Sequence, residues 1–204
     1  IQLDFGDGGK FAGSGAYRPK AMTLTLNTQD LNLKAFKPRL EATKLSGTAS
    51  ISTAGEGQRY QVNLKDARYA IESDILHANN MLDFNRAHLR AGDSRFNGRG
   101  KLGLTAERAF DLEGTIAGVN PAEFAKKAPK GSLNGSLKVS GRLAPTLDSR
   151  ASFNITRSTL VGQPAHASGT LGTRRNSSGR TDLAIKANAA VGATKAVLDG
   201  SFMD

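Results

Sequence analysis

Residues 133–143 read LNGSLKVSGRL, and this stretch decides the fold. Every odd position holds an apolar residue or glycine, and every even position holds a polar residue. Strict alternation of this kind is typical of a β-strand with one face shielded from water and the other wet. The stretch therefore predicts an amphipathic strand whose odd positions share one apolar face.

The same pattern recurs along the whole chain. Residues 96–104 alternate in the same way, as do residues 22–26, 60–64 and 147–155. Turn-forming clusters rich in glycine, proline and asparagine separate these stretches, which is typical of antiparallel sheets. We expect an all-β protein built as one long antiparallel amphipathic sheet, and the alternation of Leu31, Leu33 and Ala35 predicts one of its strands.

Glycine takes an apolar position two places after an aliphatic residue. The five clearest steps are Leu45-Gly47, Leu112-Gly114, Val139-Gly141, Ala167-Gly169 and Leu198-Gly200. Glycine weakens a strand interior and commonly marks a bulge, a bend or a close approach. Two explanations remain open here: the glycines bend the sheet, or they leave room for something that is not protein.

One short helix is predicted near residues 120–128. Asn120 is a good N-cap, Pro121 suits the first helical position and Glu123 suits the first turn. Phe124 would anchor the helix, and residues 129–131 would end it. A single helix among strands predicts an elbow at 119–131 between two stretches of sheet.

Composition narrows the class of protein. The 204 residues have a formal net charge of +10 and include 6% aromatic residues, with no Trp and no Cys. The basic residues are spread over polar strand positions, which favours a solubilising outer face over nucleic-acid binding, because stacking aromatics are scarce. Attraction to anionic lipid headgroups is the other open reading of this charge. No run of 18 apolar residues is present, so the segment itself is not expected to span a membrane as a helix.

Catalytic patterns are missing from the sequence. His77, His88 and His166 are not spaced as metal ligands, and Glu72 with Asp74 is the nearest acidic pair. No nucleophile-elbow motif or phosphate-binding loop occurs. We therefore expect no enzyme, no cofactor and no metal site.

Three segments resemble a known family. Residues 87–98 (AHLRAGDSRFNG), residues 116–135 and residues 157–171 resemble recurring segments of the translocation-and-assembly-module (TamB) proteins of the AsmA/TamB superfamily in Gram-negative bacteria. The resemblance covers roughly residues 82–202, and it implies a sheet folded into a U-shaped hydrophobic trough, also called a β-taco or repeating β-groove. It also implies that residues 1–204 are a single internal segment of a longer periplasmic β array, whose inner-membrane helical anchor lies outside this segment.

The resemblance further implies function and partners. The family carries phospholipid between the inner and outer membranes, works with an Omp85-type barrel partner in the outer membrane, and assists outer-membrane protein assembly. The first hypothesis is a non-enzymatic lipid conduit, and the alternative is a chaperone-like platform that binds nascent β-strands of outer-membrane or autotransporter proteins. A sandwich-type scaffold and a carbohydrate-acting enzyme are further readings, opposed by the glycine-thinned interior and by the lack of paired carboxylates.

The residues expected to line the trough and contact acyl chains share the apolar phase of the pattern. They are Leu24, Leu26, Leu31, Leu33, Val62, Leu64, Phe84, Leu89, Phe96, Leu102, Leu104, Phe110, Leu112, Ile116, Leu133, Leu137, Val139, Phe153, Ile155, Leu171, Leu183, Ile185, Leu198 and Phe202.

Overall fold

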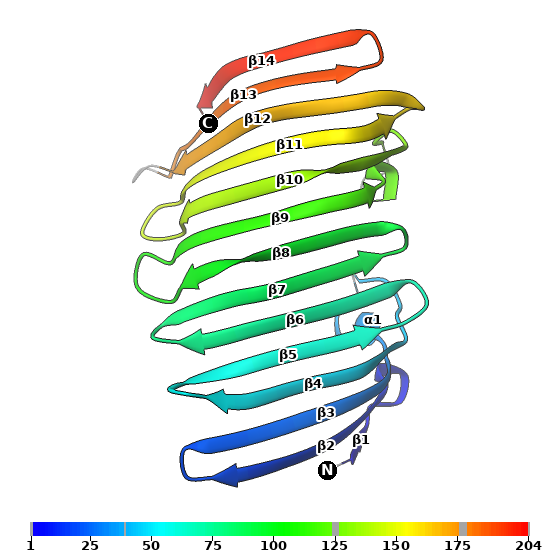
Figure 1. The fold of residues 1–204 in the computed structure, drawn as a ribbon, viewed down its shortest axis with the longest axis vertical. Coiled ribbons are helices and arrows are strands. Elements are labelled where there is room, and N and C mark those ends of the chain that lie inside the picture. The colour runs from blue at the N-terminus through cyan, green and yellow to red at the C-terminus, as the bar shows by residue number, and fades with distance from the viewer. Residues whose placement is uncertain (1, 39, 124–126, 176–178, 204) are drawn as a thin grey trace. The chain divides into compact units, whose positions relative to one another are not determined.

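The structure is a computed structural model that describes residues 2–38, 40–123, 127–175 and 179–203 (Figure 1). The chain divides into two compact units, Ile1–Gly92 and Asp93–Asp204. The expected elbow at 119–131 lies inside the second unit. Within the described residues, 14 strands make up nearly all of the regular structure, and the all-β prediction is confirmed.

The first unit contains seven strands that follow one another in chain order. Each pairs with its chain neighbours in antiparallel fashion. The elements are β1 (Gln2–Asp4), η1 (Gly6–Gly8), β2 (Lys10–Arg18), β3 (Ala21–Leu31), α1 (Leu33–Phe36), β4 (Leu45–Ala54), β5 (Gly57–Lys65), β6 (Tyr69–Ala78) and β7 (Met81–Ala91).

The second unit repeats this arrangement with seven longer strands, again antiparallel and in chain order. The elements are β8 (Ser94–Gly103), β9 (Ala109–Val119), η2 (Pro121–Glu123), β10 (Gly131–Arg142), β11 (Asp148–Leu160), β12 (Gln163–Arg175), β13 (Thr181–Val191) and β14 (Thr194–Met203).

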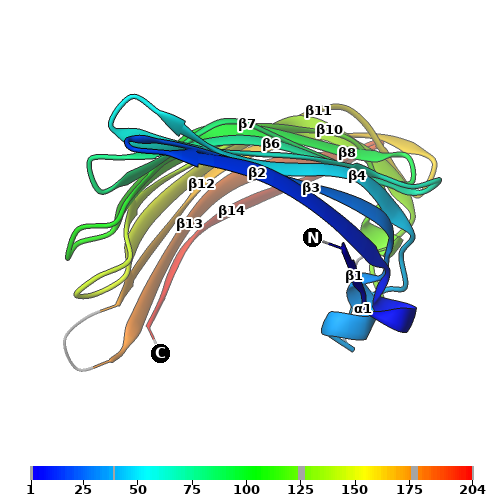
Figure 2. The ribbon, with the colours of Figure 1, turned by 90° about the horizontal axis from the view of Figure 1, so that it is seen from below.

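The strands of each unit are bent, so each unit has a concave face (Figure 2). In the first unit, α1 and η1 lie on the concave side. Phe36 of α1 packs against Phe5, and Phe5 packs edge-on against Phe11 of β2, with ring centroids 6.1 and 5.3 Å apart. Phe11 shares its face with Gly47 and Leu64 through the strand register. The apolar face of this unit is therefore the concave one.

Glycine backbones explain part of the bend. Gly47 and Gly141 have φ angles of 146° and 158°, a region that side chains other than glycine rarely adopt. A Cβ atom added at either position would overlap the backbone carbonyl of the neighbouring strand, at Asn63 and Asp148 respectively. Of the two explanations for the repeated glycines, bending of the sheet applies at these two positions, because the neighbouring backbone fills the space that a side chain would take.

Aligned β-bulges bend the second unit further. The register shifts in β10 at residues 132–135 and in β11 at residues 155–158. Asn134 joins these sites: its Oδ1 accepts from the N–H of Gly118 at 3.0 Å, and its Nδ2 donates to the carbonyl of Arg157 at 2.8 Å. Its own N–H donates to Ser158 Oγ at 2.8 Å. Bulges increase local twist and bending, and this network holds three neighbouring strands in the same bend.

Two local predictions need correction. The strand expected through Leu33 and Ala35 is wrong, because this stretch forms the short helix α1. The side chain of Asn32 caps it by accepting from the N–H of Lys34, and this local bond competes with strand pairing. The helix expected near 120–128 is present only as the 3₁₀ turn Pro121–Glu123, and residues 124–126 lie outside the described part of the chain.

Candidate functional site

Apolar side chains of the second unit form rows that run across the strands. One row is Gly98, Gly114, Leu137, Phe153, Gly169, Ala187 and Leu198, and the next is Gly100, Leu112, Val139, Ala151, Leu171, Ile185 and Gly200. Two flanking rows begin at Phe96 and Leu102. We call these four rows the apolar face of the second unit. Residues on one face of a sheet line up this way because the side-chain period of a strand is two.

Little in the structure covers this face. Leu112 is 39% exposed, Leu137 46%, Leu198 53% and Phe202 63%. Of the described apolar residues in this unit, the fully buried ones are Val119, Ala165, Ala187 and Ala190. Three of these are alanines, so they contribute little apolar area. A unit of this size would normally bury several large side chains.

The total exposed surface of the chain also indicates that the apolar face is uncovered. The chain exposes 13938 Å². Even two separate globular chains of half this mass would together expose only about 11,000 Å². The excess is what an amphipathic sheet shows when its apolar face lacks a second protein layer.

The first unit has a matching apolar face that is more mixed in character. Leu24 pairs with Ile51, which pairs with Tyr60, so these side chains form one row. Gln58 and His77 also lie on this face, at the end nearest the β4–β5 and β6–β7 turns. His77 is therefore a polar member of the apolar face rather than a residue of the outer surface.

The opposite face of each unit is polar, and its charges pair across neighbouring strands. In the second unit Arg99 pairs with Glu113, and Lys186 pairs with Asp199 at 3.6 Å. Asp148 lies between Arg142 and Arg174, at 3.7 and 3.8 Å. These pairs are largely exposed, so each contributes little stability. They fit the expected solubilising face.

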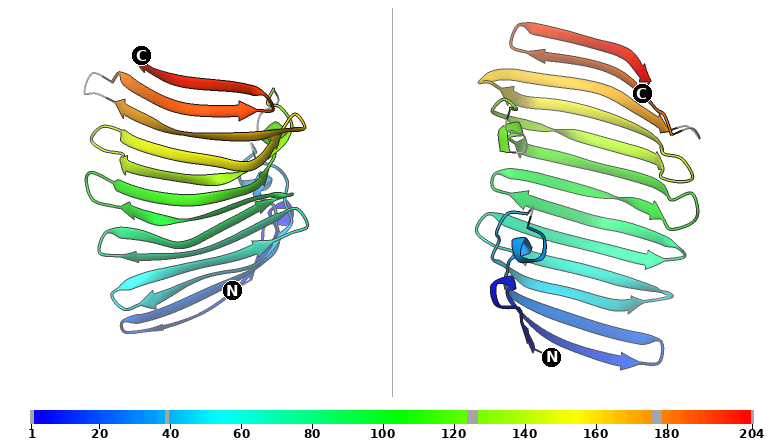
Figure 3. Two further views of the ribbon diagram at one scale, coloured as in Figure 1. Left: turned by 45° about the horizontal axis from the view of Figure 1, so that its top comes forward. Right: turned by 180° about the vertical axis from the view of Figure 1, so that it is seen from behind.

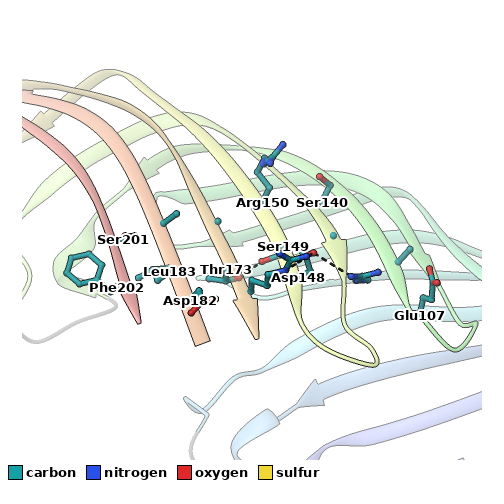
Figure 4. A pocket seen from close by; sticks show the side chains of 16 residues that line it. Glu107, Ser140, Asp148, Ser149, Arg150, Thr173, Asp182, Leu183, Ser201 and Phe202 are labelled. Atoms are coloured by element: carbon teal, nitrogen blue, oxygen red, sulfur yellow. Dashed lines mark hydrogen bonds and ion pairs between the residues drawn. The ribbon is translucent and has the colours of Figure 1, made fainter. Parts of the chain in front are cut away.

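A hollow of about 780 Å³ lies over the ends of β9–β14 (Figure 4). Two polar-face rows contribute most of its lining; Ser140 and Arg150 belong to one, and Asp148 and Asp182 to the other. The row of the apolar face that begins at Leu102 contributes the rest apart from Glu107, including Leu183 and Phe202. Three arginines and three carboxylates line the hollow. The carboxylates are Glu107 and two members of the row with Asp148, and their negative charges balance those of the arginines. The hollow has no excess charge to select a ligand, so it is a poor candidate site.

Carboxylates with shifted pKa values lie away from the apolar faces. A hydrogen bond from Arg59 lowers the pKa of Asp74 on the polar face of the first unit, and the two groups meet at 2.7 and 2.5 Å. Burial raises the pKa of Asp66, but backbone N–H groups of Tyr69, Lys44 and Arg68 lower it by more. Both carboxylates stabilise turns or strand pairs, and neither adjoins a second carboxylate as an acid–base pair would.

Within each unit, the strand register places most of the residues expected to line the trough on the apolar face, and Leu133 pairs with Val119 outside the four rows of the second unit. Leu33 lies in α1 and Leu104 follows the end of β8, so neither belongs to a row. The residues expected to line the trough did not include small members of the rows such as Ala151, because alanine carries little hydrophobic signal. Sequence reasoning also missed the segment after β3, whose only local sign was the Asn32 cap.

Among the described residues, no group of three or more His, Asp or Glu side chains is placed to hold a metal ion. In the same part of the chain, every helix is too short to cross a membrane. Comparison of the chain with protein-family models, with curated proteins and with solved structures finds no significant match. The site is therefore argued from its geometry alone.

Proposed function

We propose that this chain is a non-enzymatic hydrophobic conduit whose apolar faces hold the acyl chains of phospholipids. The observation that carries the proposal is the uncovered apolar face of the second unit, where Leu112, Leu137, Leu198 and Phe202 remain 39–63% exposed. Exposed apolar patches larger than a few hundred Å² mark interaction sites in soluble proteins. The resemblance to TamB segments supports, as part of this proposal, a location in the Gram-negative periplasm between an inner-membrane anchor and an Omp85-type barrel.

The dimensions of the second unit suit an acyl chain. Its seven strands, spaced about 4.8 Å apart, carry each row over roughly 29 Å. The hydrocarbon core of a bilayer is about 30 Å thick, so one leaflet's acyl chain reaches roughly 15 Å. A chain lying across the strands would remain within one unit.

The energetics suit transfer rather than tight binding. Burial of each methylene is worth about 0.8 kcal/mol when it leaves water completely. An open face covers an acyl chain on one side only, so the gain is smaller. Neighbouring rows offer similar surfaces, and the chain can move from one strand to the next without losing much contact. The polar face of each unit meets water throughout.

Native mass spectrometry of the purified chain tests the proposal directly. We expect copurifying phospholipid that is lost on extraction with organic solvent. Photocrosslinkers at Leu112 and Leu137 should capture lipid, and crosslinkers at Lys101 and Lys138, on the opposite face, should not. Capture of unfolded outer-membrane protein segments in place of lipid would favour the chaperone-like platform. Capture from both faces would indicate nonspecific adsorption.

A further inference from the structure

A segment between β3 and β4 leaves the sheet and returns to the point where it left. Leu31 and Leu45 are paired in register, and the intervening chain includes α1. We call its described residues, 32–38 and 40–44, the lip. The lip lies in front of the sheet of the first unit in the view from behind (Figure 3, right).

The neck of the lip is closed by a compact set of hydrogen bonds. Asn32 Oδ1 accepts from the N–H groups of Lys34 and Thr43, at 3.2 and 3.3 Å. Thr43 Oγ1 accepts from the N–H of Leu33 at 3.0 Å and donates to the carbonyl of Leu31 at 2.8 Å. Four bonds thus hold the two ends of the lip together, and the neck is partly buried.

The far part of the lip is held differently. The carboxylate of Glu41 pairs with Arg68 at 3.0 Å and accepts a hydrogen bond from the hydroxyl of Tyr69. The side chains of Glu41 and Arg68 are 65% and 54% exposed. Leu40, next to Glu41, is 44% exposed. An exposed ion pair contributes little stability, so this latch is much weaker than the neck.

The sheet beside the neck differs from the rest of the apolar face. Leu45 is 0% exposed, and Leu64 and Thr28 are each 8% exposed. Among the described residues of the first unit, Leu45 and Leu64 are the only buried leucine, isoleucine, valine or aromatic side chains. All three belong to the apolar face by register. Leu89, on the same face away from the lip, is 40% exposed.

We propose that the lip covers a second acyl-chain site on the first unit, formed by Leu45 and Leu64, and that release of the Glu41 latch opens it. This inference rests on the proposed function, because it assigns an acyl chain as the ligand. Because the latch is weak, residues 40–41 can open while the neck stays closed and Phe36 of α1 stays packed on Phe5. Local opening of this kind needs far less free energy than global unfolding. Phe36 of the lip is 56% exposed and packs against Phe5.

Cysteine reactivity can test this opening, because the chain has no native cysteine. The reporter is Leu45→Cys, labelled with a maleimide, and Leu64→Cys is a second reporter if the first variant does not fold. Glu41→Gln removes the charge of the latch. We expect labelling to become about two- to five-fold faster, the range for loss of an exposed ion pair. The double substitution Glu41→Arg with Arg68→Glu should restore slow labelling.

A control reporter separates local opening from general loosening. Ala165→Cys lies at a buried position of the second unit, and its labelling should not change with Glu41→Gln. If both reporters accelerate equally, or if neither accelerates, the lip is not opened by its latch and the inference is overturned.

Ligand identity is tested with palmitic acid carrying a tail diazirine. In the Glu41→Gln background, palmitic acid should slow the labelling of Leu45→Cys and crosslink to the first unit. Absence of this protection, with capture at Leu137 retained, would overturn the covered site and leave the conduit proposal standing. Loss of capture at both places would overturn the proposed function as well.

Discussion

Replacing Leu137 by aspartate places a charge in the middle of the apolar face of the second unit. Leu137 lies between Gly114 and Phe153 in its row, and 46% of it is exposed. Full burial of a leucine side chain is worth about 1.5–3 kcal/mol, so the half-buried side chain contributes about 0.8–1.6 kcal/mol. Because the new carboxylate reaches water, it avoids the much larger cost of an unpaired buried charge.

The expected result is a folded protein with impaired lipid binding. A loss of about 1 kcal/mol lowers the Tm of a chain of this length by roughly 2–4 °C. Lipid capture by a photocrosslinker at Phe153 should fall sharply, because an acyl chain lying along the row meets the charge. Thermal unfolding followed by circular dichroism gives the first quantity, and crosslinking yield gives the second.

Ser136→Asp is the matched control. Ser136 precedes Leu137 and lies on the polar face, where it is exposed. This variant should keep both its Tm and its lipid capture. If Leu137→Asp instead costs more than about 4 kcal/mol or prevents folding, the face is a closed core and the reasoning fails. Unchanged lipid capture in a folded Leu137→Asp protein would refute the conduit.

Three further outcomes are expected. An environment-sensitive fluorophore at Leu112 should shift to the blue when phospholipid vesicles are added, and the same fluorophore at Lys101 should not; equal shifts would contradict a one-sided site. Gly47→Ala should lower the Tm by several degrees because the new Cβ would overlap a backbone carbonyl. Gly98→Ala should be tolerated, because its Cβ would lie 3.4 Å from its nearest neighbour. Equal Tm values for the two variants would show that the sheet is not tightly bent at Gly47. The pKa of Asp74 is lowered by the hydrogen bond from its arginine partner. The contribution of Asp74 to folding stability is therefore present above the unfolded pKa of about 3.9 and is lost as the pH falls through the lower folded pKa. In urea unfolding, Asp74→Asn should lack this part of the acid sensitivity, and an unchanged pH dependence would contradict the assignment.

The alternation of residues was sufficient to predict the strands and their faces. In the stretch from Leu133 to Leu143, phase alone assigns each side chain to a face, because a one-residue slip would move every leucine into water. Phase also identified most of the apolar face. It did not single out Ala151, whose place in its row depends on register with neighbouring strands.

Sequence reasoning failed where contacts distant in the chain decide the structure. Leu33 continues the alternation of Leu31, yet the Asn32 cap turns the chain out of the sheet. The lip is then held by Glu41 through Arg68 and Tyr69, which are more than twenty-five residues away. Periodicity carries no information about such pairings, so neither the lip nor the buried corner at Leu45 could be predicted.

The pairing of each strand with its chain neighbours has a mechanical consequence. In the second unit, β11 pairs with β10 and β12, and the same holds along the series to β14. Structures in which each element contacts only its neighbours have stabilities that are close to a sum of local terms. A force applied to the backbone at Thr194 and perpendicular to the strands would load one hydrogen bond of β14 at a time. The sheet should then yield in small steps at low force, hairpin by hairpin, whereas a force along the strands would load a whole row of bonds together.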